Sequence, residues 1–410
     1  MVRILYIVDE AYPTTSANGR IVYRIIDELI KHSDIKITVL CRARNQEQLH
    51  VKSFNGCKVI HTPAINATKA EGLRKKLGKL KWLRYLVFPR TIYYRFSGER
   101  DYFMAEAKLW IKRHLNEFDV IVANSMPFYP LELAAKFGSR LPVLLYKMEP
   151  VAHYLDPNNF ELGKKIENDW DNQARAIVME DLTYKFYKQY ASSDNLKKVT
   201  VAKYPCVIRP NEYPIINEML KKDVCNLVYV GKFYYKKRDP EFLFSLMDAI
   251  QDKAVHLTIA GSYSYANLSK DYVDKYFTNR IPYISYIGEV SSQQADALLL
   301  AADILVNIGN KVPDQMPSKI LNYISAGKPI LNIYGIDDCP TLPYLEKYPL
   351  ALNIKDGEEI TNELIDKIYQ FVQLSKGKNV PFSMIEKQFE ECTPRYVGQQ
   401  FYDIIKSITE

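Results

Sequence analysis

The sequence predicts an α/β protein built from two Rossmann-like, doubly wound domains. Short apolar stretches alternate with helical stretches along the first half of the 410 residues, and the alternation restarts after residues 210–224. Such alternation is typical of a parallel sheet covered by helices on both faces. The break, "PNEYPIINEMLKKDV", holds two prolines, two asparagines and a lysine pair, as linkers do. We therefore expect domains at 1–212 and 213–393, with a final helix at about 394–410 that packs back on the first domain.

The elements follow from local patterns: strands from short runs rich in Val, Ile and Leu, and helices from apolar residues three or four apart. The strands expected in the first domain are 3–8, 36–41, 57–62, 118–125, 141–147 and 197–205, and the helices are 20–32, 102–115, 129–138 and 161–190. The strands expected in the second domain are 225–233, 255–261, 284–290, 303–309 and 329–334, and the helices are 240–251, 267–277, 291–302 and 316–328.

The stretch "DQMPSKILNYISAGKPIL" gives the clearest helix boundaries. Pro317 fits a first helical turn, and we expect Ser318 to accept a hydrogen bond from a free backbone N–H. Gly327 supplies a left-handed end, and Pro329 stops the helix before the next strand. The free N–H groups and partial positive charge of such a helix start suit an anion. A well-capped helix without a ligand is the simpler alternative.

Two domains of this kind are expected to face each other across a cleft, with ligands bound beyond the carboxyl ends of the strands. Four loops that follow strands are candidates for the site: residues 12–19, 148–154, 232–238 and 314–319. The pattern favours an enzyme or a binding protein for an anionic ligand.

The formal net charge of +7 is unevenly distributed. Residues 69–100 are rich in lysine and arginine interleaved with leucine and aromatic residues, and contain only two acids, Glu71 and Glu99. A basic amphipathic segment suits an anionic membrane surface, as a peripheral contact. A helix whose apolar side packs on its own domain is the alternative. Nucleic acid is disfavoured, because no nucleic-acid module is recognisable.

Composition also bears on compartment and metal. The six cysteines contain no C-x-x-C pair and the six histidines are dispersed, so we expect reduced thiols and no bound metal. The start, "MVRILYIVDE", predicts a buried strand rather than a signal peptide, and no apolar run is long enough to span a bilayer. A cytoplasmic protein, peripheral at the inner membrane face, is the expectation.

Several motifs in order resemble the GT-B glycosyltransferases, closest to the large retaining group called family four. "VYVGKFYYKKRDPEFLF" resembles the family's strand and Gly-Arg, with a Lys six positions after the Gly; Gly231 and Lys237 match, and Lys232 stands where Arg is usual. "LTIAGSY" supplies Gly261 and "ISYIGEV" supplies Glu289. "MPSKILNYISAGKPIL" resembles the family's Pro-Ser-Lys helix and its Gly-Lys-Pro end.

The resemblance implies transfer of a hexose from a nucleotide sugar to a hydroxyl of a saccharide or lipid-linked acceptor, with retention and without a metal, in surface polysaccharide synthesis. Negative charge then develops on the leaving diphosphate and must be stabilised by the protein. Lys232 and Lys237 are the candidate cations, and Ser318 and Lys319 offer backbone N–H groups. In retaining members the leaving phosphate takes the acceptor's proton. Ordinary solvated surface is the alternative for both lysines.

The family's two glutamates, eight positions apart, fall on Asp314 and Asn322. Asp314 can still accept bonds from sugar hydroxyls, whereas Asn322 loses a charge-assisted bond to the ribose. This departure supports an alternative: a GT-B protein without turnover that acts as a partner subunit or binds a glycan.

On the acceptor side, Asn18 and Gly19 stand where the family has paired glycines, Glu149 follows a strand, and His153 lies nearby. The alternatives are a plain helix entry, a surface glutamate and a structural histidine. An epimerase or phosphorylase on the same fold is a further enzyme hypothesis. A dinucleotide-dependent dehydrogenase is disfavoured, because no G-x-G-x-x-G follows either domain's first strand.

Overall fold

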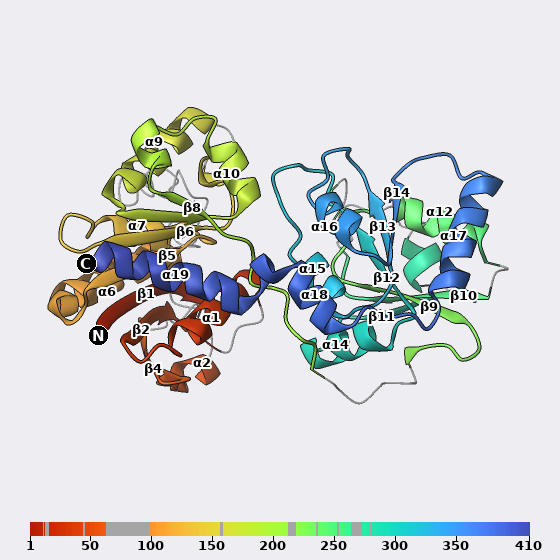
Figure 1. Cartoon of the computed structure of the whole chain (residues 1–410), viewed down its shortest axis with the longest axis horizontal. Helices are drawn as coiled ribbons and strands as arrows, with labels where there is room; N and C mark the ends of the chain where they lie inside the picture. Colours follow the sequence, from red (N-terminus) through yellow and green to blue (C-terminus); the bar gives the residue numbers. More distant parts are fainter. Residues whose placement is uncertain are drawn as a thin grey trace, which may run out of the picture. The chain divides into compact units, whose positions relative to one another are not determined.

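The computed structural model describes residues 1–10, 12, 16–43, 46–62, 98–155, 159–211, 219–234, 237–251, 254–263, 273–278 and 281–410. The chain divides into unit 1, Met1–Pro205 with Pro394–Glu410, and unit 2, Cys206–Thr393. Each unit holds one sheet of mainly parallel strands (Figure 1), so the predicted class of two doubly wound α/β domains is confirmed.

Unit 1 has an 8-stranded sheet in the order β3-β4-β2-β1-β5-β6-β7-β8. Every pairing is parallel except that of β3 with β4. The strands are β1 Val2–Glu10, β2 Ile35–Arg42, β3 Ser53–Phe54, β4 Cys57–Thr62, β5 Val120–Asn124, β6 Val143–Lys147, β7 Ala176–Met179 and β8 Val199–Val201.

Helices cover both faces of this sheet, because neighbouring residues of a strand point to opposite sides. In β6, Leu145 belongs to the core cluster shared with α6 and α7, whereas the ring of Tyr146 packs edge-on against Phe401 of α19, with centroids 5.1 Å apart. The helices are α1 Ala17–Leu29, α2 Gln46–His50, α6 Gly98–His114, η1 Leu115–Glu117, α7 Tyr129–Ala135, α8 Val151–Leu155, α9 Phe160–Gln173, α10 Asp181–Tyr187, α11 Ser193–Leu196 and α19 Pro394–Thr409.

The C-terminal helix α19 lies beside α1 in unit 1 (Figure 1). The ring of Tyr402 stacks on His32 with centroids 3.8 Å apart, and Lys406 Nζ lies 3.0 Å from an oxygen of Asp34. Gly398 permits the close packing, since a Cβ there would come within 2.3 Å of Glu28. The helix therefore joins unit 1 although unit 2 precedes it in the sequence.

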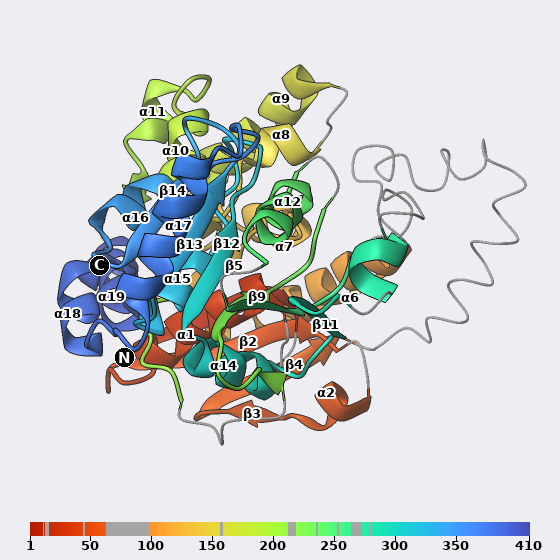
Figure 2. The same cartoon turned by 90° about the vertical axis from the view of Figure 1, so that its right-hand side faces the viewer.

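Unit 2 has a 6-stranded parallel sheet in the order β11-β10-β9-β12-β13-β14, whose later strands lie side by side in Figure 2. Numbered along this unit, the order is 3-2-1-4-5-6, as in dinucleotide-binding Rossmann sheets, and it reverses between β9 and β12. Ligands of such sheets bind at that switch point, outside the carboxyl ends of the strands. The strands are β9 Cys225–Val230, β10 Val255–Ala260, β11 Ile284–Gly288, β12 Ile304–Ile308, β13 Ile330–Tyr334 and β14 Ala351–Lys355.

The core of unit 2 forms where α12 and α17 pack on one face of the sheet, against Leu227 and Tyr229 of β9 among others. The unit also contains α14 and α15. Helix α15 buries Ile320, Leu321 and Ile324. The helices are α12 Glu241–Ala249, η4 Asp274–Thr278, α14 Ser292–Ala301, α15 Lys319–Ser325, α16 Leu342–Lys347, α17 Asn362–Ser375, α18 Phe382–Gln388 and η5 Glu390–Cys392.

The prediction of one helix over 161–190 is wrong. Helix α9 ends at Gln173, the four buried residues of β7 form a strand, and α10 begins after it. Glu180 caps α10 by accepting the N–H groups of Leu182 and Thr183. A strand this short, between two polar helices, leaves little periodicity to distinguish it from a buried helical turn.

Two helix starts also differ from expectation. Helix α1 begins at Ala17, not at residue 20, and the hydroxyl of Ser16 caps it by accepting the N–H of Gly19 at 3.0 Å. Ser318 makes no side-chain capping bond, because its backbone is already helical. The sequence also gave no expectation for α16, β14, α17 and α18, which complete unit 2.

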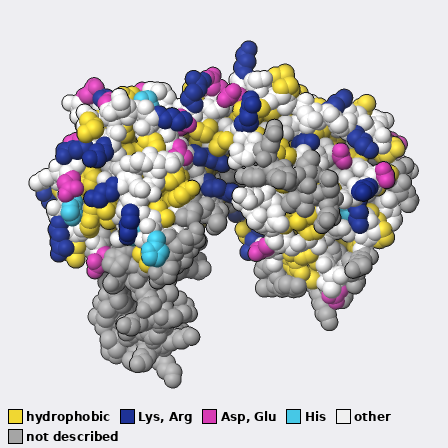
Figure 3. All heavy atoms as spheres, turned by 90° about the horizontal axis from the view of Figure 1, so that it is seen from below, with side chains coloured by type: hydrophobic (Ala, Val, Ile, Leu, Met, Phe, Trp, Pro, Cys, Tyr) yellow, Lys and Arg dark blue, Asp and Glu magenta, His cyan; other side chains and the backbone are white. Residues whose placement is uncertain are grey.

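The basic segment 69–100 lies almost entirely outside the described residues. On the face drawn in Figure 3, described lysines and arginines are spread among acidic and apolar side chains. Among the described residues, no helix is long and apolar enough to cross a membrane. All six cysteines are buried thiols that form no disulfide.

Candidate functional site

Two glycines bring backbone close together at the carboxyl ends of neighbouring strands in unit 2. Gly231 follows β9 with a φ of +148°, and Gly261 follows β10 with a φ of +140°. A Cβ at Gly261 would lie 1.9 Å from the carbonyl oxygen of Gly231, so no other residue fits there without displacing the backbone. The missing side chain at Gly261 is therefore what lets the backbones of these two strand ends lie so close together.

Lys319 places an amine beside this glycine pair. Its Nζ lies 4.4 Å from the ring centroid of Tyr229 and 5.7 Å from that of Tyr323, and a Cβ on Gly231 would be 3.2 Å from it. The nitrogen is shielded from water and has no hydrogen-bond partner in the described part of the chain. Burial, and then the positive charge of Arg238, lower the pKa of Lys319 well below its ordinary value.

Arg238 supplies a second cation. Its Nη2 donates to Asn310 Oδ1 at 2.6 Å, which joins the loop after β9 to the loop after β12. Its Nε is buried and has no acceptor among the described residues. The bond to Asn310 goes to a neutral amide oxygen, so it does not neutralise the charge of Arg238.

The same two loops are joined a second time by Lys237. Its Nζ donates to Gln315 Oε1, and Asn310 Nδ2 donates to the backbone oxygen of Gln315 at 3.1 Å. Lys311 differs, because its Nζ lies 2.7 Å from Asp356 and 3.5 Å from Asp239, and these acids balance its charge.

This arrangement suits a phosphate-bearing anion. A buried polar group without a partner costs about 1–3 kcal/mol, and a charged one costs more. Lys319 Nζ and Arg238 Nε are both such groups, and they lie beside the switch point between β9 and β12. An anion bound there would give both nitrogens an acceptor and offset that cost.

The other residues predicted for the donor side follow strands of the same sheet. Lys232 is exposed, with its Nζ 5.6 Å from the ring centroid of Tyr234. Asp314 lies in the turn next to Gln315. Glu289 is exposed just after β11, where Gly261 N donates to Gly288 O at 2.7 Å.

At the start of α15, the backbone N–H groups of Ser318 and Lys319 donate to no described residue. Asn322 is half-buried on the same helix, and its side chain forms no hydrogen bond with a described residue. Because α15 has only 7 residues, its dipole is small, and the side chain of Lys319 is the stronger source of positive charge.

The residues predicted for the acceptor side belong to unit 1. Asn18 and Gly19 lie in the first turn of α1, and neither has a positive φ. Glu149 lies half-buried in the turn after β6. His153, on α8, packs against Phe160 at 4.6 Å and Phe186 at 5.7 Å between centroids, which gives the ring a structural contact.

Unit 1 also holds a buried network of charged residues. Lys147 Nζ lies 2.7 Å from Glu167 Oε1 and 2.7 Å from Asp171 Oδ2. The hydroxyls of Tyr187 and Tyr190 donate to Asp171 and Glu167 at 2.6 Å and 2.7 Å. Burial raises the pKa of Asp171 to about 6, although the charge of Lys147 acts in the opposite direction.

Sequence reasoning missed Arg238, Asn310 and Gln315, and it assigned Lys319 through its backbone alone. Arg238 was only a neighbour of Lys237, and nothing in the sequence marks its contact with a loop 72 positions away. The two rings that flank Lys319 belong to Tyr229 on β9 and Tyr323 on α15, and no local pattern in the sequence marks either residue as part of a site. Among the described residues, no group of three or more His, Cys, Asp or Glu could hold a metal ion.

No protein-family model and no curated protein matches the chain. Solved structures do match it. The Anabaena protein Alr3699/HepE, solved in complex with UDP, is 16% identical with a TM-score of 0.59, over 99% of this chain and 100% of that chain. The lipopolysaccharide outer core galactosyltransferase WaaB, in its apo form, is 13% identical with a TM-score of 0.59, over 99% of both chains.

A glycosyltransferase from Rickettsia africae ESF-5 is 12% identical with a TM-score of 0.65, over 100% of this chain and 99% of that chain. Likeness at such identities is evidence of fold. Together with the two mainly parallel sheets, it shows that the chain has the GT-B fold of these glycosyltransferases.

Proposed function

We propose that the protein is a glycosyltransferase that moves a hexose from a nucleoside-diphosphate sugar to a hydroxyl group of a saccharide or lipid-linked acceptor. The observation that carries the proposal is the pair of buried nitrogens without an acceptor, Lys319 Nζ and Arg238 Nε. The fold adds support, because HepE has the same fold and was solved with UDP.

The chemistry requires cations at this place. When the bond between the anomeric carbon and the diphosphate oxygen breaks, negative charge grows on the leaving diphosphate. Lys319, Arg238 and Lys237 would stabilise that charge, and Lys232 would extend the cluster toward solvent. Because protein nitrogens supply the positive charge, we expect no metal requirement. We also expect retention of anomeric configuration and a role in surface polysaccharide synthesis, both from the family resemblance.

The remaining donor residues are assigned by chemistry. Gly231 and Gly261 allow the backbone to approach the diphosphate, and the free N–H groups at the start of α15 add donors. Asp314 is proposed to accept bonds from sugar hydroxyls, and Asn322 to bond the ribose. Glu289 is a further candidate contact to the donor.

On the acceptor side, Glu149 is proposed to orient the hydroxyl that attacks. Asn18, Gly19 and His153 are weaker candidates, because the N–H of Gly19 is already bonded to Ser16 and the His153 ring is already packed. The basic segment 69–100 is proposed to contact an anionic membrane, which would bring a lipid-linked acceptor to the enzyme.

The test is to measure the unfolding temperature of the protein in the presence of UDP, GDP, dTDP or CMP, each with and without Mg²⁺. A nucleotide at a hundred times its Kd should stabilise the protein by about 2.7 kcal/mol. Arg238→Gln should abolish the shift, whereas Lys275→Gln, which removes an exposed ion pair to Asp248 in the same unit, should leave it unchanged. The absence of a shift from every nucleotide would contradict the donor site.

A second measurement separates an enzyme from the non-catalytic alternative. Slow release of nucleoside diphosphate from its sugar donor, without acceptor, is expected of a transferase. A protein that binds the nucleotide but releases no nucleoside diphosphate from the sugar donor, even with acceptors added, would instead be a binding subunit. Asn322 stands where the family has a glutamate, so Asn322→Glu would then be the first variant to make.

A further inference from the structure

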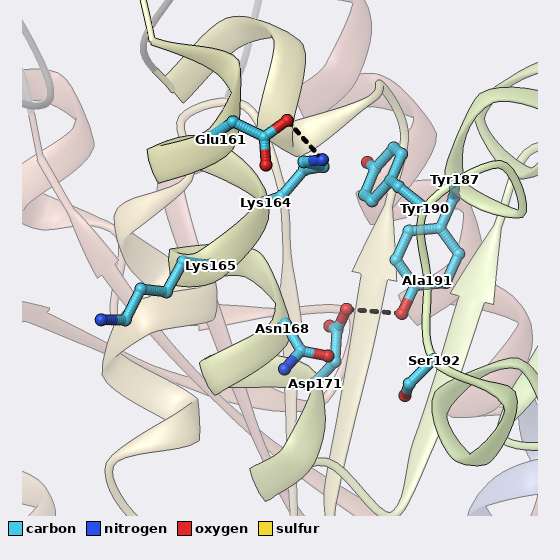
Figure 4. Close-up of a pocket in the computed structure, with 9 residues that line it drawn as sticks. All are labelled: Glu161, Lys164, Lys165, Asn168, Asp171, Tyr187, Tyr190, Ala191 and Ser192. Atoms are coloured by element: carbon cyan, nitrogen blue, oxygen red, sulfur yellow. Dashed lines mark hydrogen bonds and ion pairs between the residues drawn. The ribbon is translucent and has the colours of Figure 1, made fainter.

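Unit 1 contains a cavity of about 360 Å³ between α9 and the segment that follows α10 (Figure 4). Small-molecule pockets commonly measure about 300–1,000 Å³, so the cavity could hold one small ring. It is formed within unit 1 alone and shares no residue with the Arg238–Lys319 cluster. The residues that line it are Glu161, Lys164, Lys165, Asn168, Asp171, Tyr187, Tyr190, Ala191 and Ser192.

The base of the cavity is rigid because it belongs to the buried network around Lys147. Asp171 is fully buried, and its Oδ2 accepts bonds from Lys147 Nζ at 2.7 Å and from the Tyr187 hydroxyl at 2.6 Å. The ring of Tyr190 is held edge-on between Phe160, at 5.4 Å, and Tyr187, at 5.5 Å between centroids. A half-buried aromatic ring is therefore fixed beside the cavity before any ligand binds.

The walls offer hydrogen-bonding groups. Asn195 Nδ2 donates to Asn168 Oδ1 at 2.9 Å, which orients the Asn168 amide and leaves its NH₂ group without a bond to any described residue. Lys164 Nζ lies 2.6 Å from Glu161 and keeps two further N–H donors. In Figure 4 the Asn168 side chain lies beside Asp171, while Lys165 extends away from the other labelled residues.

The formal charges of the lining cancel. The lining holds two acids, Glu161 and Asp171, and two amines, Lys164 and Lys165. A phosphate or sulfate would meet no net positive charge, and an amine ligand would meet no net negative charge. A neutral ligand with several hydroxyl groups satisfies both the mixed donors and acceptors and the aromatic wall.

We propose that this cavity binds a neutral sugar residue, at a site separate from the Arg238–Lys319 cluster. The tyrosine ring packs against the apolar face of the sugar, and Asn168 and Lys164 donate to its hydroxyls. The inference does not rest on the proposed transferase activity, because it uses only residues of unit 1. In a transferase, such a site would hold part of the saccharide chain away from the reacting end.

The experiment measures saturation-transfer NMR signals from methyl α-glucopyranoside, methyl β-galactopyranoside and N-acetylglucosamine on the full chain. Each sugar is measured with and without excess UDP, and again in the Arg238→Gln variant. At least one sugar should give a signal that neither UDP nor Arg238→Gln changes. Binding only in the absence of UDP, or its loss in Arg238→Gln, would place the sugar at the unit 2 cluster and overturn the proposal.

Variants of the cavity complete the test. Ala191→Phe should fill it and abolish the signal, and Lys164→Met should weaken binding by about tenfold, the effect of one lost hydrogen bond. Asn168→Asp, which removes the NH₂ donor at almost constant size, should also weaken binding if Ala191→Phe fails to fold. The matched control is Lys188→Met, an exposed lysine just after α10 that does not line the cavity.

Three results would overturn the proposal: no signal from any of the sugars, a signal that the cavity variants leave unchanged, or loss of the sugar signal on adding sodium sulfate at constant ionic strength. The last result would identify an anion site. None of these outcomes bears on nucleotide binding in unit 2, so a failure here is distinguishable from a failure of the donor site.

Discussion

The two units treat a buried lysine in opposite ways. In unit 1, Lys147 is fully buried and its amine contacts both Glu167 and Asp171 at 2.7 Å. In unit 2, the amine of Lys319 is also shielded from water, yet it lies over tyrosine rings without a hydrogen-bond partner among the described residues, and Arg238 is a second cation near it. The residue type is the same in both places, and the partners differ.

The difference distinguishes a buried charge that is paired within the protein from one that we expect a bound ligand to pair. A buried charge with its counter-charges in place contributes to a unique packing, and removing one partner strands the others. A buried cation without an acceptor destabilises the free protein and is retained where something else gains from it. Unit 1 therefore holds its counter-ions in the chain, whereas unit 2 is expected to receive them from a diphosphate.

The largest expected effect comes from breaking the network of unit 1. Lys147→Met leaves Glu167 and Asp171 buried without their cation, and should lower the free energy of unfolding by about 3–5 kcal/mol. Urea denaturation, monitored by circular dichroism, measures this change in the free energy of unfolding. Lys164→Met is the matched control, because its pair with exposed Glu161 is worth about 0–1 kcal/mol. Equal effects of the two variants would mean that burial does not distinguish these lysines.

The corresponding change in unit 2 should have the opposite sign for stability. Lys319→Met replaces an unpartnered amine by an apolar group of similar length, so the free protein should unfold at the same or a higher temperature. Nucleotide affinity should fall by about 1.5–3 kcal/mol, the value of a hydrogen bond to a charged group. Calorimetric titration with the nucleotide that stabilises the wild type measures the affinity. If Lys319→Met destabilises the free protein and leaves nucleotide affinity unchanged, Lys319 is a structural residue and not part of the nucleotide site.

A smaller effect is expected from the edge of the unit 1 network. Tyr190→Phe removes the hydroxyl that donates to Glu167 at 2.7 Å but keeps the ring. Because Lys147 and the backbone N–H of Ala152 still bond Glu167, the loss should be about 1.5 kcal/mol. Urea denaturation gives the value. A loss as large as that of Lys147→Met would show that the hydroxyl, rather than the amine, holds the network together.

The smallest expected signal is a fraction of a proton. The pKa of Lys319 is lowered in the free protein, so at pH above that lowered value the amine is largely neutral and must take up a proton to bind a phosphate. Nucleotide affinity should therefore decrease as pH rises, more steeply in the wild type than in Lys319→Met. Titrations in buffers of different ionisation enthalpy measure the uptake, and equal uptake by both proteins would exclude Lys319 as its source.

The same linkage has a sign for stability. The unfolded chain binds a proton at Lys319 up to its ordinary pKa, and the folded chain does not, so the wild type should gain stability relative to Lys319→Met as pH rises through this window. Asp171 has the reverse sign, because its raised pKa makes its contribution fall as pH increases from about 4 through about 6. Asp171→Asn should remove that component of the pH dependence.

Much of the fold follows from the sequence because its signals are local. The buried run "CNLVYV" is a strand in the structure, and Gly231 after it takes the positive φ that only glycine adopts readily. The segment "AIVM" was predicted as helix because four residues between two polar helices are too few to reveal a strand. The position of Gly261 could be anticipated because it follows directly on the strand β10, whereas Lys237 lies further along the loop after β9.

The sequence by itself determined the class of fold, the strand ends that carry the glycines, and the presence of lysines there. Only the tertiary structure decided that Arg238 meets Asn310 and that Lys319 lies over Tyr229, and only packing brought Lys147 within reach of Glu167 and Asp171. The physical reason is range. Periodicity and turn preferences act over a few residues, whereas the burial of a charge, and whether it finds a partner, depend on elements far apart in the chain.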